Sequence, residues 1–260
     1  MLKHLTAIRY VAPLREGGSL PAIVEADDHQ LYVMKFRGAG QGVKALIAEL
    51  LVGEIARALG LNVPEIVLID LDPAMGKSEP DEEIQDLLKF SVGLNLALAY
   101  LPGALMFETP AAPPPDPLLA SAIVWLDAYV TNVDRTPRNA NILLWQRDLW
   151  LIDHGAALYF HHAWNGDQAR ARKPFPYIKD HILLRFASAL PEADARLTPK
   201  LDEPTLRAIV NAVPAEWLAN EPGFADAQAV RDAYLTFLRD RLVAPRAFVE
   251  EAIHARAAHV

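Results

Sequence analysis

The chain has 260 residues, of which 52% are hydrophobic, and its 25 Lys and Arg against 33 Asp and Glu give a net charge of −8 with His neutral. A chain of this length can bury a substantial core, and its negative charge argues against non-specific coating of nucleic acid. The absence of cysteine excludes disulfides, a thiolate nucleophile and cysteine-ligated zinc. We recognise no secretory signal and no apolar run of the ~18 residues that a membrane span needs, so we expect a cytoplasmic protein.

The first third of the sequence is predicted to form strands and one helix. Short, partly alternating apolar stretches separated by turn-like residues are typical of strands. The segment 42–60 has helical periodicity and ends at Gly60, a residue type that commonly follows a helix. The predicted strands are 5–11, 20–26, 31–36 and 63–71, with a further apolar strand in 90–107 that ends at Pro102–Gly103.

The remaining two thirds are predicted to be mainly helical. Residues 72–89 are acidic and polar, which indicates a surface excursion with a short helix. The segment 109–117 has five prolines in nine residues, so it cannot be a helix or a central strand. Beyond it, helical spacing recurs in 117–131, 203–213 and 226–257. We therefore predict an α+β protein with a small β-rich lobe at 1–101 and a larger, mainly helical lobe at 102–260.

The most informative pattern lies between Asp134 and Gly155. Asp134 and Asn139 flank a short loop that precedes the predicted strand ANILLW. A hairpin of NILLW and LWLID would return Asp153 to the same loop, because adjacent strands lie ~4.8 Å apart. We expect Gly155 to allow the sharp chain reversal that follows.

Two carboxylates and an amide gathered in this way suit phosphoryl transfer. The protein then mainly positions the nucleophile and neutralises charge with Mg²⁺ and cations. Mg²⁺ prefers oxygen ligands, and a third carboxylate can orient the incoming hydroxyl and accept its proton. Taken alone, an Asp and an Asn five residues apart also form an ordinary turn that satisfies local backbone groups. Support from the front part of the chain decides between these interpretations.

That support comes from Lys35, which lies in a predicted strand among apolar neighbours. A lysine at this position either faces water or needs an anion nearby. The next predicted helix has two glutamates that could supply it. By helical periodicity Glu54 falls inside the apolar arc, whereas Glu49 lies opposite the centre of that arc. Periodicity alone therefore marks Glu54 as the carboxylate that would be buried.

The wording NVDRTPRNANILL followed by LIDHG resembles HipA-like kinases of the protein-kinase-like superfamily, and it is also similar to type II phosphatidylinositol 4-kinases. The resemblance runs from GGSLP to IDHG and weakens after Gly155. It implies that Asp134 is the catalytic Asp and that Asn139 and Asp153 are the Mg²⁺ ligands. His154 stands where protein kinases have Phe, a departure that bears on any activation switch.

The resemblance also assigns residues in the front lobe. Lys35 would contact the nucleotide phosphates and would be held by Glu49, which lies eleven residues before the Gly of GLNVP. REGGSLP, between the first two predicted strands, would cover the phosphates, and LAYLPGA would contact adenine through its backbone. The residues assigned to these two segments are Gly17, Gly18, Ser19, Ala99 and Leu101.

Together these features predict an ATP- and Mg²⁺-dependent phosphotransferase with a protein-kinase-like bilobal fold, acting on a hydroxyl of a protein substrate or of itself. Two alternatives stay open: a kinase of a small molecule or lipid head group, and a nucleotide-binding module that has lost turnover. The basic stretch 170–179 could dock an acidic substrate, form an activation-type segment or be a solvated loop. The acceptor is not predicted, and a regulatory protein partner is compatible with the motifs.

Overall fold

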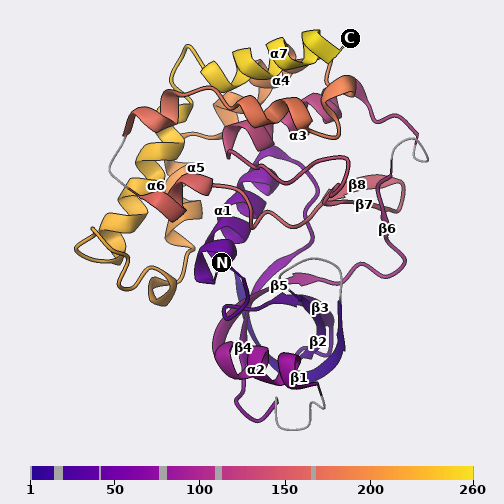
Figure 1. The fold of residues 1–260 in the computed structure, drawn as a ribbon, viewed down its shortest axis with the longest axis vertical. Helices are drawn as coiled ribbons and strands as arrows, with labels where there is room; N and C mark the ends of the chain where they lie inside the picture. The colour runs from indigo at the N-terminus through magenta and orange to yellow at the C-terminus, as the bar shows by residue number, and fades with distance from the viewer. Residues whose placement is uncertain are drawn as a thin grey trace.

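The computed structural model describes residues 2–14, 20–40, 42–75, 81–108, 113–164 and 168–259. Its first part is a closed five-stranded barrel in the order β1-β2-β3-β5-β4, seen as a ring of strands in Figure 1. Neighbouring strands are antiparallel except β1 and β4, which run parallel and close the barrel. The strands are β1 (Lys3–Pro13), β2 (Ala22–Ala26), β3 (Leu31–Lys35), β4 (Ile66–Leu71) and β5 (Gly93–Ala99).

Strict alternation along β3 decides which way Lys35 points. Tyr32 and Met34 are buried inside the barrel, where they belong to its hydrophobic core. Successive side chains of a strand point to opposite faces, so Val33 and Lys35 lie on the outer face. The outer face of the adjacent strand β5 packs against the helical part of the molecule. Lys35 is therefore directed away from the barrel interior and toward that packed side.

The helix α1 (Val43–Leu59) joins the barrel to the helical part, as Figure 1 shows. It ends as predicted at Gly60, whose φ of 88° is left-handed and whose N–H donates to the Arg57 carbonyl. Residues 46–53 are all buried, which amounts to two full turns enclosed on every side. These turns pack on the outer face of β5 and within the same core as the later helices.

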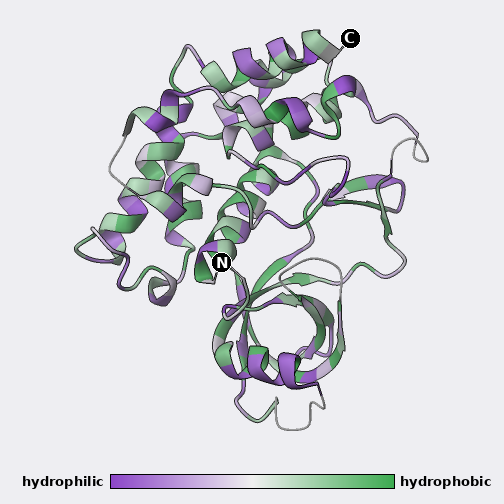
Figure 2. Cartoon of the chain, in the orientation of Figure 1, coloured by the Kyte–Doolittle hydropathy of each residue, from purple (hydrophilic) through white to green (hydrophobic). Residues whose placement is uncertain are grey.

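The helix α2 (Glu82–Phe90) lies across one end of the barrel. Asp81 caps it by accepting the Glu83 N–H, and the helix contributes Ile84 and Leu88 to the barrel core. Its outer face is largely hydrophilic (Figure 2). The predicted short helix in an acidic excursion is therefore confirmed.

The second part of the chain contains helices and a small antiparallel sheet in the order β6-β7-β8. Its sheet strands are β6 (Leu105–Met106), β7 (Ile142–Trp145) and β8 (Asp148–Leu151). Its α-helices are α3 (Pro117–Tyr129), α4 (Leu190–Leu197), α5 (Glu203–Asn211), α6 (Ala227–Arg241) and α7 (Ala247–His259). Short 3₁₀ helices lie at η2 (Tyr159–Ala163), η3 (Gln168–Arg172), η4 (Pro176–Asp180), η5 (Leu184–Phe186), η6 (Thr198–Lys200) and η7 (Ala215–Trp217).

The α+β class is confirmed, and two predicted segments were wrong in detail. The helical spacing over 226–257 belongs to two helices, α6 and α7, because Pro245 between them has no N–H to continue a helix. The predicted strand in 90–107 begins only at Gly93, because Phe90 still belongs to α2, and as β5 it ends at Ala99, shortly before the predicted end at Pro102–Gly103. None of the helices in the described ranges has the length and apolar character that crossing a bilayer requires.

Candidate active site

Three charged side chains from distant parts of the chain meet on the outer face of the barrel. Lys35 Nζ donates to Glu49 Oε2 at 2.7 Å and to Asp153 Oδ1 at 2.6 Å. Glu49 is fully buried and the Lys35 side chain is 11% exposed, whereas the Asp153 side chain is 44% exposed. We call these residues the Lys35 cluster. It is closed toward the protein and open toward solvent at Asp153.

The electrostatics of the Lys35 cluster keep its lysine charged. Burial alone would lower the pKa of Lys35, but the two carboxylates raise it above the usual lysine value. The Lys35 charge in turn holds the pKa of Asp153 below its usual value, against the effect of burial. Lys35 is therefore protonated and lies beside an ionised, half-exposed Asp153. Such a pair can receive a polyanionic ligand together with a metal ion.

Periodicity in α1 was wrong about which glutamate is buried. Glu54 is partly exposed and lies 3.7 Å from Arg57, one turn further along the helix. Glu49 has no exposed surface and pairs with Lys35. The reason is that the middle of α1 is enclosed on every side, so a residue opposite the apolar arc is buried as well. The environment of the helix, rather than its own pattern, decides the burial of these residues.

The loop after α3 holds Asp134 next to two asparagines. Asn139 Nδ2 donates to Asp134 Oδ2 at 2.7 Å, and Asn141 Nδ2 donates to the same oxygen at 3.3 Å. Thr136 and Asn139 pair through their backbones and form a tight turn in this loop. Burial raises the pKa of Asp134, the Asn141 hydrogen bond opposes the rise, and the Asp153 charge adds to it. The negative charge of Asp153 is therefore close enough to affect the pKa of Asp134.

The predicted hairpin of NILLW and LWLID is confirmed as β7 and β8, with Ile142 opposite Leu151. It returns the chain to the loop, where Asn141 Nδ2 lies 3.5 Å from the Asp153 carbonyl oxygen. Asp153 itself adopts the left-handed conformation with φ of 55°, which costs a non-glycine residue roughly 1–2 kcal/mol.

The chain turns at Gly155 as expected, where the Ala157 N–H donates to the His154 carbonyl at 2.9 Å, although the positive φ is at Asp153 rather than at the glycine. Gly155 also lies close to α1, where an added Cβ would be 3.4 Å from the Ala45 Cβ. Its small size allows the close approach of this loop to the start of the helix.

A second charged group, which sequence reasoning missed, lies directly beneath the Asp134 loop. Asp127 of α3 accepts hydrogen bonds from Arg135 Nε at 2.6 Å and from His181 Nε2 at 2.8 Å. All three side chains are buried, and we call them the Asp127 cluster. Burial alone would raise the pKa of Asp127, but the Arg135 charge and the His181 hydrogen bond hold it well below its usual value.

The sequence did contain a signal for this cluster, because Asp127 is the single charged residue in the apolar segment 117–131. Arg135 follows Asp134 directly, so its buried side chain fixes the backbone that carries Asp134. The Arg135 guanidinium also donates to the Asn141 carbonyl.

His154 connects the two clusters. Its backbone N–H donates to Glu49 Oε2 at 2.7 Å, and its ring Nδ1 lies 3.2 Å from Arg135 Nη2. Burial, aided by the Arg135 charge, lowers the pKa of His154 to about 3, so the ring is neutral and Nδ1 accepts from the guanidinium. A phenylalanine at this position could not accept that hydrogen bond.

The predicted nucleotide contacts are only partly described. Gly17, Gly18 and Ser19 lie outside the described residues. Ala99 ends β5, and its N–H donates to the Glu65 carbonyl at 2.8 Å. Only the Ala99 carbonyl therefore remains available to accept a hydrogen bond from an adenine. The Leu101 carbonyl accepts from the Ala104 N–H at 3.2 Å, so Leu101 would offer its N–H instead.

Asp153 offers a carboxylate on the open side of the Lys35 cluster, and Asn139, which lies beside Asp134, offers an amide oxygen. The described residues include no group of three or more His, Asp or Glu able to hold a metal by themselves. Mg²⁺ usually takes one or two protein carboxylates and completes its shell with phosphate and water. The donor set therefore fits a Mg²⁺ ion that arrives with a nucleotide.

Comparison with known proteins gives a consistent result for family and fold. A family model described as HipA-like kinase matches residues 8–243. No curated protein sequence matches the chain. Among solved structures, the proinflammatory kinase CtkA of Helicobacter pylori superposes with a TM-score of 0.57 at 13% identity, over 100% of this chain and 99% of that one.

The Golgi casein kinase gives a TM-score of 0.48 at 12% identity, over 99% of this chain and 72% of that one. A structure of the Golgi casein kinase with Mn/ADP bound gives 0.44 at 13% identity, over 97% and 74% of the two chains. The CtkA likeness shows the fold alone.

Proposed function

Because the chain belongs to the HipA-like kinase family and is therefore a kinase, we propose that it transfers the γ-phosphoryl group of ATP, with Mg²⁺, to a hydroxyl of a protein substrate or of itself. We further propose that residues 1–101 and 102–260 act as the two lobes of a protein-kinase-like fold. ATP would then lie between the barrel and the loop that carries Asp134.

The contact of Lys35 with both Glu49 and Asp153 is the observation that carries this proposal. Lys35 and Asp153 are 118 residues apart, and their side chains lie 2.6 Å apart. Turn chemistry explains neither this approach nor the burial of Glu49 beneath the lysine. A charged lysine held between a buried and a half-exposed carboxylate suits the phosphates of a nucleotide that brings a divalent cation.

The roles we assign follow from position and charge. Lys35 binds the nucleotide phosphates and Glu49 holds the lysine in place. Asn139 and Asp153 hold Mg²⁺, which when bound neutralises the charge that develops on the phosphate oxygens. Asp134, whose pKa is raised by burial and by Asp153, orients the acceptor hydroxyl and accepts its proton.

We assign adenine to the end of β5. The Ala99 carbonyl would accept from the adenine amino group and the Leu101 N–H would donate to a ring nitrogen. Gly17, Gly18 and Ser19 would cover the phosphates with backbone N–H groups and a hydroxyl.

Mass spectrometry of the purified protein after incubation with Mg²⁺ and ATP tests transfer directly. We expect added phosphate on the chain itself or, in a cell lysate, on an acceptor protein, and neither product with Asp134→Ala. Phosphorylation of lipids or metabolites with no protein product would instead favour the small-molecule alternative.

The metal assignment has its own test. Mg²⁺ and ATP should raise the melting temperature of the parent protein by more than that of Asp153→Ala, because the variant loses a metal ligand. Equal shifts in the two proteins would contradict the role of Asp153.

A further inference from the structure

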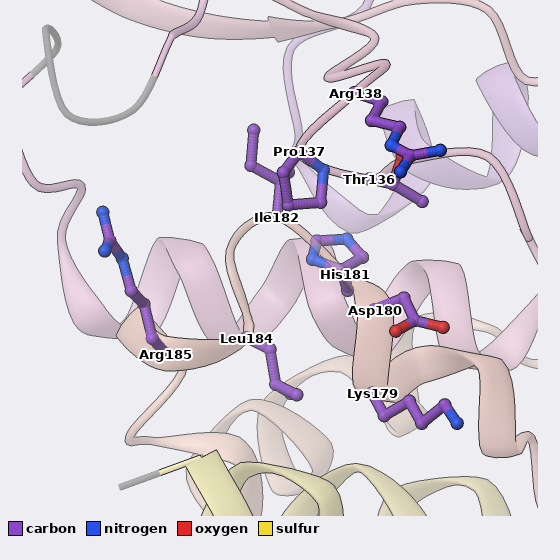
Figure 3. Close-up of a pocket in the computed structure, with 9 residues that line it drawn as sticks. All are labelled: Thr136, Pro137, Arg138, Lys179, Asp180, His181, Ile182, Leu184 and Arg185. Carbon is purple, nitrogen blue, oxygen red and sulfur yellow. The ribbon is translucent and has the colours of Figure 1, made fainter.

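A pocket of about 630 Å³ opens beside the loop that carries Asp134 (Figure 3). One wall is the turn 136–138, and the other is the segment 179–185, which runs from the end of η4 to η5. Its volume lies within the range of about 300–1,000 Å³ that is usual for ligand pockets. None of the roles assigned above uses this pocket.

The two walls of the pocket are joined at their base. The Ile182 N–H donates to the Arg135 carbonyl at 3.1 Å. His181 donates to Asp127 from Nε2 and accepts the Leu183 N–H on Nδ1 at 3.0 Å, so both nitrogens of the neutral ring are used. Because Arg135 follows Asp134, the pocket and that carboxylate share one buried junction. A ligand in the pocket would be held in a fixed relation to Asp134.

The pocket carries positive charge on a chain whose net charge is −8. Arg138, Lys179 and Arg185 are exposed, and within the described residues they form no ion pair. Asp180 is the one acidic residue among those that line the pocket, and the pKa of His181 is lowered by burial, so its ring stays neutral. Cations that are not neutralised by their own protein remain free for an anionic ligand.

The arrangement of these cations indicates the shape of the ligand. Figure 3 shows the charged ends of Arg138, Lys179 and Arg185 on different sides of the pocket rather than converging on one point. A single phosphate or carboxylate would contact one of them at a time. Between them lie the apolar side chains of Pro137, Ile182 and Leu184. An extended ligand with several negative charges and some apolar surface fits this pattern.

We propose that this pocket binds the acceptor and that the acceptor is an acidic peptide segment, in which a Ser or Thr is flanked by Asp or Glu. The inference rests on the proposed function and names its substrate class. In the reaction the acceptor hydroxyl oxygen forms a bond to the γ-phosphorus of ATP. The bond between that phosphorus and the β,γ-bridging oxygen breaks, Asp134 takes the hydroxyl proton, and ADP and a phosphopeptide result.

Three fluorescent peptides of equal length test the proposal, each with one central serine flanked by Glu, by Gln or by Lys. Steady-state phosphorylation by the full chain gives kcat and KM, and fluorescence anisotropy without ATP gives binding. We expect the Glu peptide to exceed the Gln peptide at least ten-fold in kcat/KM and to bind more tightly. The Lys peptide should be the poorest of the three.

Two variants test whether the pocket causes the preference for the Glu peptide. Lys179→Gln and Arg185→Gln should each raise KM for the Glu peptide about two- to five-fold, as expected for exposed charge pairs, and leave KM for ATP unchanged. Lys89→Gln is the control, because it removes an equal charge from the exposed face of α2, which lies on the barrel (Figure 1) and does not line the pocket; Lys89 itself pairs with Asp86. A parallel loss in the control would mean that overall charge, rather than the pocket, causes the effect.

The outcomes separate this inference from the proposed function. Equal binding and equal kcat/KM for the Glu and Gln peptides would overturn the acidic acceptor while leaving kinase activity intact. Phosphorylation of a small anionic metabolite with no peptide product would overturn the peptide assignment. Failure of the protein to phosphorylate itself or any acceptor would instead contradict the proposed function, and the anisotropy measurement would still decide whether the pocket prefers acidic peptides.

Discussion

The Lys35 cluster and the Asp127 cluster are built from similar side chains but differ in their access to solvent. The Lys35 cluster ends at Asp153, whose side chain is 44% exposed, whereas Asp127 and Arg135 have no exposed side-chain surface. Asp127 accepts hydrogen bonds from Asn132, Arg135 and His181 and has no exposed surface, so its carboxylate is closed to solvent on every side. Buried charge alone therefore does not indicate a ligand site, whereas a buried charged cluster that opens to solvent does. We therefore expect changes in the open cluster to affect activity and changes in the closed one to affect stability.

The largest effect on activity is expected from Asp134→Asn. The substitution keeps the size of the side chain and its ability to accept from Asn139, but it removes the carboxylate that we propose accepts the proton. Phosphoryl transfer should fall by about 10²–10⁴-fold in a single-turnover assay, while ATP affinity and melting temperature stay close to those of the parent. Retained transfer would contradict the assigned role.

The largest effect on stability is expected from Asp127→Asn, which leaves the Arg135 guanidinium buried without its anion. Removing one partner of a buried ion pair costs about 3–5 kcal/mol, and urea denaturation should show a loss of this size. Glu25→Gln, which removes the anion from the exposed Arg9, is the control and should lose far less stability, because water screens an exposed ion pair. Similar losses in the two variants would remove the distinction between the clusters.

A smaller loss of activity is expected from Glu49→Gln, and none from Glu54→Gln, although both glutamates belong to α1. Glu49→Gln removes the buried anion that holds Lys35, and a lysine displaced by about 1 Å can cost on the order of 10²-fold in transfer. Glu54→Gln changes a partly exposed residue that lies near Arg57 and should leave transfer unchanged. Equal losses in a kinase assay would argue against the pairing of Lys35 with Glu49.

The smallest effect, counted for a single side chain, is a pH dependence of stability that distinguishes buried histidines from buried carboxylates. Burial lowers the pKa of His154 and of His161 to about 3, and it also lowers that of His181. In an unfolded chain a histidine titrates near 6.5, so below that pH the unfolded chain binds more protons. Stability should therefore be complete above about pH 6.5 and fall by about 1.4 kcal/mol per pH unit for each such histidine as the pH drops.

Urea denaturation at pH 7.5 and 5.5 measures this loss. His181→Gln should lose less between the two pH values than the parent, while His254→Gln, an exposed change on α7, should behave like the parent. The depressed pKa of Asp127 adds a further loss only below about pH 4, where an unfolded carboxylate takes up its proton. A stability that is flat from pH 7.5 to 5.5 would contradict the neutral buried state of the histidines.

Local pattern predicted the features that depend on neighbouring residues. The alternation around Lys35, the hairpin that precedes Asp153 and the end of α1 at Gly60 all follow from short-range periodicity or turn chemistry. The partners of Asp127 did not, because His181 is 54 residues away and nothing near it indicates a buried contact. The burial of Glu49 likewise depends on the elements that surround α1, and the left-handed backbone of Asp153 on contacts made across the loop.

The enclosure of α1 bears on how such an enzyme can be regulated. A helix such as α1 could in principle regulate activity by moving outward, which would separate Glu49 from Lys35, and inward, which would restore the ion pair. Here residues 46–53 are packed on every side, and an added methyl group at Gly53 would overlap the Ile66 Cδ1. Moving this helix would open the apolar interface between the barrel and the helical bundle, so we expect a regulator to act instead on the loops that would admit nucleotide and acceptor in the proposed function.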